Sequence, residues 1–350
     1  MNVKGLFLCI LLCLPVSARA QGFAGLGSDA TGFAVPERGK TLRFPQDHGP
    51  HPAYRIEWWY LTANLKGEDG NSYGIQWTLF RSALAPHDAE GWDSPQLWMG
   101  HAGLTTPDTH FHAERLARGG IGQAGVRAAP FEAWIDDWQM TGAPGRGLDS
   151  LKLTARGDAF FYDLSLTANG PLVTHGDRGF SVKSREGQAS FYYSQPFYTV
   201  SGILNLPSGP VRVTGQGWLD REWSSQPLSQ SQTGWDWFSL SFDSGDKLMG
   251  FRLRDEAGDF TSGTWIGADG TAFSLPHNIL RAMPLMHSDV GGRSIPTDWR
   301  IELESPRISV DISALNPRAW MDTSFPYWEG PVKIEGSHSG MGYLEMTGYD

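Results

Sequence analysis

The sequence predicts an all-β protein built from two similar units. The first observation is a repeat: residues 57–64 and 236–243 both read acid, Trp, aromatic, variable, Leu, hydroxyl, apolar, then Asn or Asp. The second is the composition, because 43 glycines and 22 prolines indicate many turns. The third is a succession of short segments in which apolar and polar residues alternate, as they do in half-buried strands. Such a chain is expected to form a sandwich or barrel.

Each copy of the repeat is followed by a turn and a second alternating segment. The turn at 67–71 precedes the alternating segment 75–79, and the turn at 244–246 precedes the segment 249–253. Turns rich in Gly, Asp and Asn join neighbouring strands into hairpins. We therefore expect two matching hairpins, nearly 180 residues apart, that descend from one unit.

Further strands are expected along the rest of the chain. In the first half they lie at 98–104, 109–116, 131–138, 151–155, 160–166, 190–193 and 198–204. In the second half they lie at 211–218, 261–266, 299–304, 308–312, 327–337 and 342–347. The one expected helix is short and lies near 276–282.

The first twenty residues read as a secretory signal peptide. Lys4 precedes an apolar run at 6–16, and Ala18-Arg19-Ala20 supplies small residues for cleavage after Ala20. The run is too short for a transmembrane helix, which needs about 20 residues. We expect a periplasmic or secreted protein without a transmembrane segment. Both cysteines lie inside the signal, so the mature chain is expected to have no disulfide.

The mature chain is expected to divide into an irregular segment and two domains. Residues 21–44 are rich in Gly and Ser, and the domains are expected at 45–206 and 211–350. Pro and Gly between them interrupt a continuing ladder. The net charge of −10 argues against nucleic acid as a partner.

Three residues at 218–222 are candidates for acid chemistry. Trp218, Asp220 and Glu222 share one strand face because every second side chain of a strand points the same way. Neighbouring carboxylates beside an apolar wall raise one another's pKa, as a general acid requires. Alternatively, Arg221 or an arginine from a neighbouring strand pairs with one of them and the cluster is structural.

The acids that begin the two repeats also lie on apolar faces. Glu57 shares a face with Trp59, and Asp236 shares one with Phe238. Such an acid must be paired, hydrogen-bonded or protonated. Two interpretations remain open here: a structural ion pair at the mouth of each barrel, or a set of acids that line a ligand cavity.

Other chemistries have little support in the sequence. His101, His110, His112 and Glu114 include the residue types that bind zinc, but they lack a recognised spacing, and satisfied strand histidines are the alternative. No Gly-x-Ser-x-Gly elbow, P-loop or dinucleotide fingerprint occurs. We expect no metal and no cofactor.

Several segments together resemble one known family. The segments at 57–60, 100–115, 217–223, 235–237, 327–330 and 342–349 look like the bacterial carotenoid 1,2-hydratases and their secreted lipocalin-like relatives, the AttH-like proteins or predicted secreted hydrolases. The resemblance covers nearly all of the mature chain. It implies two lipocalin-like antiparallel β-barrel domains packed together.

For the hydratase members, the resemblance implies cofactor-free, acid-catalysed addition of water to the terminal double bond of a linear carotene. Asp220 matches the acid, and Trp218 stands where an aromatic ring would stabilise the cation. Trp237, with Tyr192 or Tyr193, would line the pocket. The ligand-binding candidates are Glu57, Trp59, Tyr192, Tyr193, Asp236 and Trp237.

These observations leave three functions open. The first is an enzyme that hydrates or hydrolyses an apolar lipid or isoprenoid-like molecule, with Glu222 or Asp236 tuning Asp220. The second is a non-catalytic periplasmic carrier of such a molecule, working with a membrane exporter. The third is a structural module whose tryptophans only pack.

Overall fold

The computed structural model describes residues 30–349. The expected signal peptide and the first part of the segment 21–44 lie outside these residues. From 30 to 44 the chain forms turns and extended stretches without a strand. No helix in the described part of the chain is long and apolar enough to cross a membrane.

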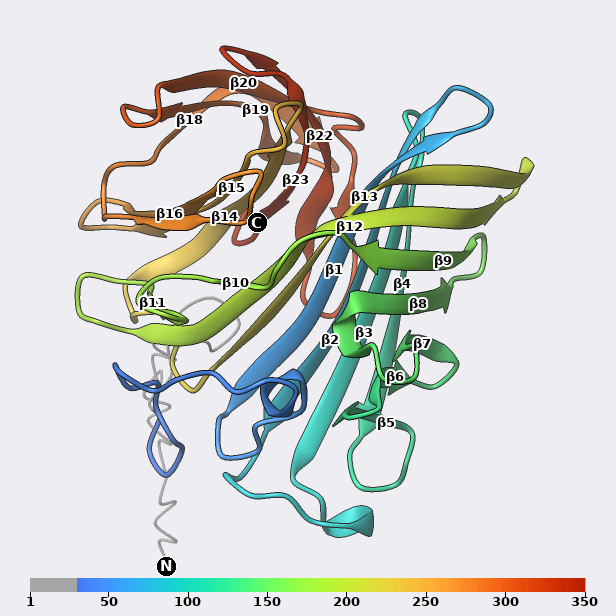
Figure 1. Ribbon diagram of the computed structural model, residues 1–350, viewed down its shortest axis with the longest axis vertical. Helices are drawn as coiled ribbons and strands as arrows, with labels where there is room; N and C mark the ends of the chain where they lie inside the picture. The colour runs from blue at the N-terminus through green and yellow to red at the C-terminus, as the bar shows by residue number, and fades with distance from the viewer. Residues whose placement is uncertain (1–29, 350) are drawn as a thin grey trace, which may run out of the picture.

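Two curled antiparallel sheets, packed together, make up the molecule (Figure 1). The 13-stranded first sheet contains β1 (Ile56–Gly67), β2 (Ser72–Ala83), β3 (Gln96–Thr105), β4 (His110–Arg118), β5 (Ala124–Ala128), β6 (Phe131–Ile135), β7 (Trp138–Gly142), β8 (Ser150–Arg156), β9 (Phe161–Ala168), β10 (Val173–Thr174), β11 (Phe180–Val182), β12 (Ala189–Leu206) and β13 (Gly209–Ser224). The 10-stranded second sheet contains β14 (Gln232–Phe242), β15 (Lys247–Asp255), β16 (Phe260–Ile266), β17 (Ala272–Leu275), β18 (Arg281–Val290), β19 (Arg293–Leu303), β20 (Ile308–Ala314), β21 (Trp320–Met321), β22 (Tyr327–Gly336) and β23 (Gly340–Met346). The predicted all-β architecture of two barrel-like units is confirmed.

The strand order repeats between the sheets. The first sheet runs β4-β3-β2-β1-β13-β12-β9-β8-β7-β6-β5, with β10 and β11 paired to β12. The second runs β17-β16-β15-β14-β23-β22-β20-β19-β18, with β21 paired to β22. In both sheets the first strand pairs with the last strand of the same sheet: β1 with β13, and β14 with β23.

The two predicted hairpins are β1–β2 and β14–β15. In both, the acid that starts the repeat faces an arginine directly across the ladder: Glu57 is opposite Arg81, and Asp236 is opposite Arg252. The repeat therefore extends from sequence to cross-strand register.

The chain passes from the first sheet to the second at a later residue than expected. Residues 206–211 are the tip of the hairpin between β12 and β13, where Leu206 pairs with Gly209 and Asn205 with Pro210. Gly209 has a φ of +115°, which a glycine adopts without strain. Since β13 pairs with β1, the first sheet continues to Ser224 and the second begins at Gln232. The expected division at 206–211 is corrected to 225–231.

The expected helix near 276–282 is also wrong. Residues 277–280 form a turn, and β18 begins at Arg281. Asn278 has a φ of +68°, which ends any helix there. Helical structure within residues 30–349 is limited to three short 3₁₀ turns, η2 (Gln46–His48), η3 (Gly91–Asp93) and η4 (Gly147–Asp149).

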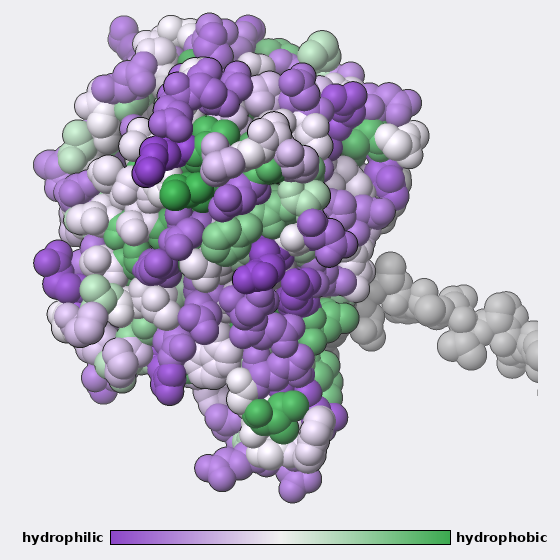
Figure 2. All heavy atoms as spheres, turned by 90° about the vertical axis from the view of Figure 1, so that its right-hand side faces the viewer, coloured by the Kyte–Doolittle hydropathy of each residue, from purple (hydrophilic) through white to green (hydrophobic). Residues whose placement is uncertain are grey.

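Each sheet encloses its own apolar core, and a third core lies between the sheets. In this third core the ring of Tyr60 from β1 meets Trp237 from β14 edge-on, with 5.2 Å between centroids. The sheets approach closely at Gly74, where a Cβ would lie 2.5 Å from the ring of Pro331. The face seen in Figure 2 mixes hydrophilic residues with smaller hydrophobic areas. The candidate functional site lies in the layer between the sheets.

Candidate functional site

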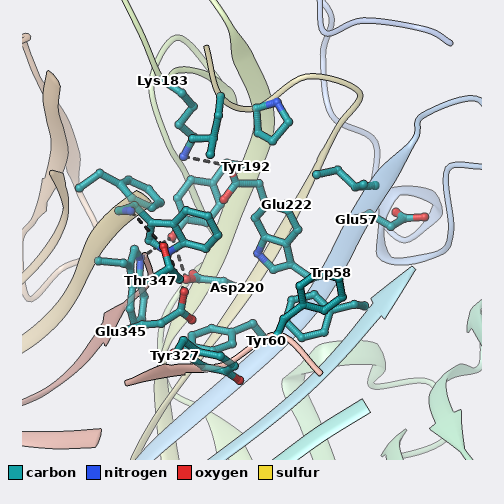
Figure 3. Close-up of a pocket in the computed structure, with 18 of the residues that line it drawn as sticks. Glu57, Trp58, Tyr60, Lys183, Tyr192, Asp220, Glu222, Tyr327, Glu345 and Thr347 are labelled. Carbon is teal, nitrogen blue, oxygen red and sulfur yellow. Dashed lines mark hydrogen bonds and ion pairs between the residues drawn. The ribbon is translucent and has the colours of Figure 1, made fainter. Parts of the chain in front are cut away.

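A pocket of about 170 Å³ opens into the layer between the two sheets (Figure 3). The first sheet contributes β1, β2, β3, β12 and β13 to its wall, and the second contributes β14, β15, β22 and β23. Its lining is mainly apolar and aromatic, with Trp58, Tyr60, Trp235, Trp237, Phe251 and Leu253 among the members. Four acidic residues, Glu57, Asp220, Glu222 and Glu345, also belong to the lining.

Strand β13 presents its two faces to different environments. Asp220 and Glu222 point into the pocket, and Trp218 belongs to the core between the sheets. Leu219 and Trp223, on the opposite face, belong to the core of the first sheet. Successive side chains of β13 therefore alternate between the pocket layer and the core of the first sheet. The sequence predicted that Trp218, Asp220 and Glu222 share one face.

Asp220 is buried and surrounded by neutral hydrogen-bond donors. The Trp218 indole donates to Oδ1 at 2.6 Å, and the Tyr192 hydroxyl donates to Oδ2 at 2.7 Å. The Ser194 hydroxyl also donates to Oδ1. Burial raises the pKa of Asp220 to about 7, and these three hydrogen bonds oppose the rise. A carboxyl group that is partly protonated near neutral pH is suited to proton donation.

A buried histidine, His175, contacts the Ser194 hydroxyl that donates to Asp220. His175 Nε2 lies 2.6 Å from the Ser194 hydroxyl, and Nδ1 lies 2.9 Å from the hydroxyl of Thr264. Burial lowers the pKa of His175 well below its usual value, so the ring is neutral. Since Ser194 donates to Asp220, the ring must donate from Nε2 and accept at Nδ1. The ring also packs on Tyr192, with 4.1 Å between centroids.

Glu222 differs from Asp220 because it has a cationic partner. Lys183 Nζ lies 2.9 Å from Glu222 Oε1, and both side chains are buried. The ammonium group also lies 3.6 Å from the centroid of the Phe251 ring. The sequence left open whether a cation pairs with one acid of the 218–222 cluster. Glu222 is paired in this way, but its cation is Lys183 rather than an arginine.

The second sheet supplies two more acids on the opposite side of this layer. Glu345 from β23 lines the pocket and accepts a hydrogen bond from Trp235 Nε1 at 2.6 Å. Burial raises the pKa of Glu345 to about 7. Glu329 from β22 accepts a hydrogen bond from Tyr60, and burial raises its pKa well above the usual value. Among residues 30–349, no Lys or Arg forms an ion pair with Asp220, Glu329 or Glu345.

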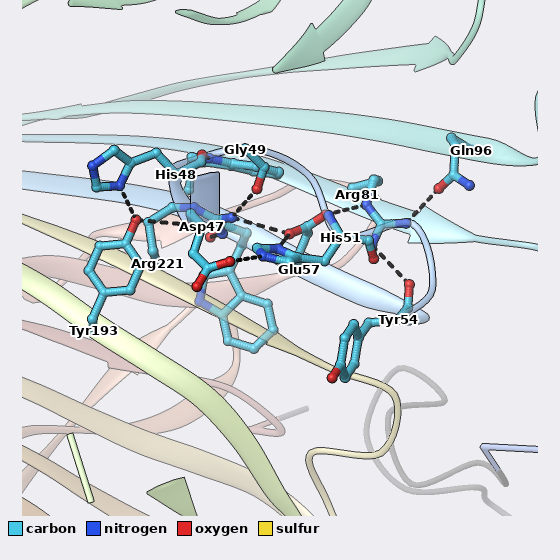
Figure 4. A network of polar contacts seen from close by, with 12 residues as sticks. Asp47, His48, Gly49, His51, Tyr54, Glu57, Arg81, Gln96, Tyr193 and Arg221 are labelled. Atoms are coloured by element: carbon cyan, nitrogen blue, oxygen red, sulfur yellow. Dashed lines mark hydrogen bonds and ion pairs between the residues drawn. The ribbon is translucent and has the colours of Figure 1, made fainter. Parts of the chain in front are cut away.

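Glu57 lies in a different, strongly cationic environment (Figure 4). Arg81 Nε lies 2.5 Å from Oε1, and Arg221 Nη2 lies 3.2 Å from Oε2. His51 adds contacts from its backbone N–H at 2.7 Å and from its ring at 2.9 Å. Although burial alone raises the pKa of Glu57, Arg81 and His51 outweigh it and hold this pKa far below its usual range.

Asp236 has the equivalent surroundings in the second sheet. Arg254 lies 2.7 Å and Arg252 3.3 Å from its two oxygens, and the Tyr349 hydroxyl donates at 2.9 Å. Burial raises the pKa of Asp236, and the two arginines oppose this rise. Both repeat acids thus form ion pairs, as in the first interpretation left open above, and Glu57 also belongs to the pocket lining, as in the second.

The pocket includes five of the nine predicted site residues. Asp220, Glu222, Tyr192, Trp237 and Glu57 line it. Trp218 is not part of the lining but donates a hydrogen bond to Asp220. Three others lie elsewhere. Trp59 and Tyr193 belong to the core of the first sheet, where Tyr193 bonds His48 at 2.6 Å. Asp236 lies in its own ion-pair cluster.

Several residues in and around the pocket carried no signal in the sequence. Glu345, Glu329, Lys183 and His175 come from segments far from Asp220 in the chain. Only the parity of the C-terminal strand, which puts Tyr343 and Glu345 on one face, hinted at an inward acid. The contact between the two sheets is what brings these side chains together.

The histidines of the first sheet do not form a cluster suited to a metal. His101 bonds Glu114 at 3.1 Å and the Tyr327 hydroxyl at 3.0 Å, whereas His110 bonds Thr105 at 2.9 Å. Within the described residues, no group of three or more His, Cys, Asp or Glu is arranged to hold a metal ion.

Comparison with known proteins identifies the family. The AttH-like family model matches residues 35–349. A putative AttH from Nitrosomonas europaea has a crystal structure with 32% identity and a TM-score of 0.81, covering 91% of this chain and 99% of that one. Kievitone hydratase from Nectria haematococca shares the fold at 16% identity, with a TM-score of 0.67 and coverage of 90% and 98%. No curated protein matches this chain in a sequence search. The chain belongs to the AttH-like family, as its sequence motifs predicted.

Proposed function

We propose that this protein adds water to a carbon–carbon double bond at one end of an apolar, isoprenoid-like or lipid molecule. The observation that carries the proposal is Asp220: a buried carboxyl group with a pKa of about 7, no cationic partner among the described residues, and a place on the wall of an aromatic pocket. Kievitone hydratase, which has the same fold, is a hydratase by name.

The reaction needs three things that the pocket residues supply. Asp220 in its neutral form transfers a proton to one alkene carbon, which leaves a carbocation on the other. The rings of Trp58, Trp235 and Trp237 stabilise that cation through their negative faces. Water then bonds to the cation and loses a proton, so the product is an alcohol and no cofactor is consumed.

The size of the pocket limits what enters it. A cavity of about 150 Å³ holds a molecule the size of benzene, and this pocket measures about 170 Å³. It therefore accommodates one branched end of a substrate, such as a terminal isoprene unit, while the rest of a longer chain lies outside. Phe325, which is 44% exposed and also lines the pocket, offers an apolar surface for that part.

The test uses a short isoprenoid with a trisubstituted terminal alkene, incubated with the protein in ¹⁸O-labelled water. We expect an alcohol that carries one ¹⁸O atom. Asp220→Asn should lower turnover by at least about 100-fold, the usual contribution of a general acid, while ligand-induced quenching of tryptophan fluorescence persists. Asp163→Asn, which alters a solvent-accessible aspartate of β9 in the same sheet, is the matched control. Unchanged turnover in Asp220→Asn would overturn the assignment of the acid.

A second candidate is a carrier that binds such a molecule without changing it and passes it to a membrane exporter. The mainly apolar lining of the pocket favours this function as much as it favours hydration. Native mass spectrometry that finds a co-purified lipid, together with no ¹⁸O incorporation by the wild-type protein, would favour the carrier.

We also propose that the protein works in the periplasm or outside the cell. The support is the signal-like composition of residues 1–20. Expression of the full chain followed by N-terminal sequencing should give a mature protein that begins at Gln21. Recovery of an uncleaved chain from the cytoplasm would contradict export.

A further inference from the structure

Glu345 lies on the wall of the pocket that belongs to the second sheet, whereas Asp220 belongs to the first (Figure 3). Glu345 is partly exposed and lines the pocket, whereas Asp220 is 2% exposed. The Trp235 indole donates to Oε1 at 2.6 Å and orients the group. Two carboxyl groups on opposite walls of one pocket are thus available to one substrate.

A hydration requires a second proton-handling group in addition to the acid. The attacking water must lose a proton, and a nearby carboxylate accepts it more readily than bulk water does. Asp220 and Glu345 interact electrostatically, and the negative charge of Asp220 raises the pKa of Glu345 beyond the effect of burial. Such a pair tends to hold a single proton near neutral pH. One member is then a donor while the other is an acceptor.

The other acids of this layer are less suited to accept that proton. Glu222 is ion-paired with Lys183 and accepts a hydrogen bond from Ser190. Glu329 accepts a hydrogen bond from Tyr60 and is not part of the pocket lining. Glu345 combines access to the pocket with the lack of an ion pair in the described chain.

We propose that Glu345 is the second catalytic carboxylate of the pocket, the base that takes a proton from the attacking water. This inference rests on the proposed function. Asp220 gives its proton to the alkene and becomes ionised, water bonds to the resulting carbocation, and Glu345 receives the proton that this water releases. One C–H and one C–O bond form, and one π bond breaks. The proton on Glu345 then returns to Asp220 through solvent before the next turnover.

The first test is the pH profile of kcat/KM. The wild-type profile should be bell-shaped around pH 7, because activity needs Glu345 ionised and Asp220 protonated. Glu345→Gln should lower kcat/KM by about 100-fold or more and should remove the acidic limb, so that the remaining activity no longer falls below pH 7. A purely structural role of Glu345 would leave both limbs in place and would overturn the inference.

The second test is chemical rescue. Glu345→Ala leaves space for a small carboxylate, so added formate should restore turnover at least about tenfold. Formate should not rescue Glu345→Gln, whose amide still fills the space. Glu335→Gln changes an exposed glutamate of β22 and should behave as wild type. Tryptophan quenching by ligand shows whether each variant is folded and binds.

The outcomes separate this inference from the proposed function. If the wild type hydrates the alkene and Glu345→Gln turns over as fast, then the inference is wrong and the proposed function stands. If the wild type binds alkenes and hydrates none, then the proposed function fails, and the inference fails with it.

Discussion

Two groups of buried acids in this protein differ in their partners. Glu57, inside the first sheet, lies within 3.2 Å of two arginines. Asp220 lies on the neighbouring strand but faces the other way, and its hydrogen-bond donors within residues 30–349 are Ser194, Tyr192 and Trp218. Both side chains are almost completely buried. Burial acts on both, yet the pKa of Glu57 is far below its usual range and that of Asp220 is raised to about 7.

The difference shows that burial alone does not decide the charge of an acid. A cation within ion-pair distance keeps a buried carboxylate ionised, whereas neutral donors compensate only part of the desolvation. An acid of the first kind stabilises the fold, and one of the second kind is available for proton transfer. Asp236 and Glu345 on the adjacent strand β23 differ in partners in the same way, since only Asp236 has two arginines, although burial raises the pKa of both.

The largest expected effect is on stability. Glu57→Gln leaves Arg81 and Arg221 buried without their counter-charge and should lower the free energy of unfolding by about 3–5 kcal/mol. Asp220→Asn resembles the neutral acid and should not lower it at pH 7, because the raised pKa of Asp220 means that the wild type has lost stability by this pH. Urea denaturation measures both. Equal losses in the two variants would remove the distinction between the two groups.

The next effect is an opposite dependence of stability on pH. The pKa of Asp220 is about 7 in the folded protein and near 3.8 when unfolded, so the stability it contributes is present below pH 3.8 and is lost as the pH rises to 7. The pKa of Glu57 is lowered on folding, so its contribution is present above its unfolded value of 4.5 and is lost as the pH falls.

Replacing Asp220 should therefore flatten the pH dependence between pH 5 and 7. The free energy of unfolding of the wild type, relative to Asp220→Asn, should fall by up to about 1.4 kcal/mol per pH unit in this window. Urea titrations at several pH values provide the measurement. Parallel curves for the two proteins would mean that Asp220 titrates alike in both states.

A smaller effect is expected from a single hydrogen bond to Asp220. Tyr192→Phe removes the donor at 2.7 Å from Oδ2 and should raise the pKa of Asp220 further, by about 1–2 units, because a bond to a charged group is worth about 1.5–3 kcal/mol. The shift would appear in the alkaline limb of kcat/KM. Tyr193→Phe is the matched control, since the next side chain faces the core of the first sheet; an equal shift in both would contradict the geometry.

The sequence predicted well the local features of these acids, namely the strand faces on which they lie and the hairpins that carry them. Strand parity placed Asp220 and Glu222 on one face, and the repeat predicted both hairpins, because these depend on neighbouring residues only. Parity also placed Glu57 and Asp236 on apolar faces, but it did not tell which of the two interpretations holds. That depended on arginines such as Arg81, which lies 24 residues away across the ladder.

Features that arise from contact between the sheets could not be predicted from the sequence. Glu345 and Asp220 line one pocket only because β23 of one sheet and β13 of the other both border the layer between the sheets. Tyr192 and Tyr193 are chemically alike, and the register of β12 alone decides that Tyr192 faces the pocket. The misplaced boundary at 206–211 has a similar cause, since Pro and Gly mark a hairpin tip as readily as a linker.

The most direct test of this account is the pKa of Asp220, measured by ¹³C NMR on protein with labelled aspartate and assigned with Asp220→Asn. We predict a carboxyl resonance that titrates at about pH 7, well above the ordinary value of 3.8. A resonance that titrates together with the exposed aspartates would contradict the claim that this pocket holds an acid ready to give up its proton.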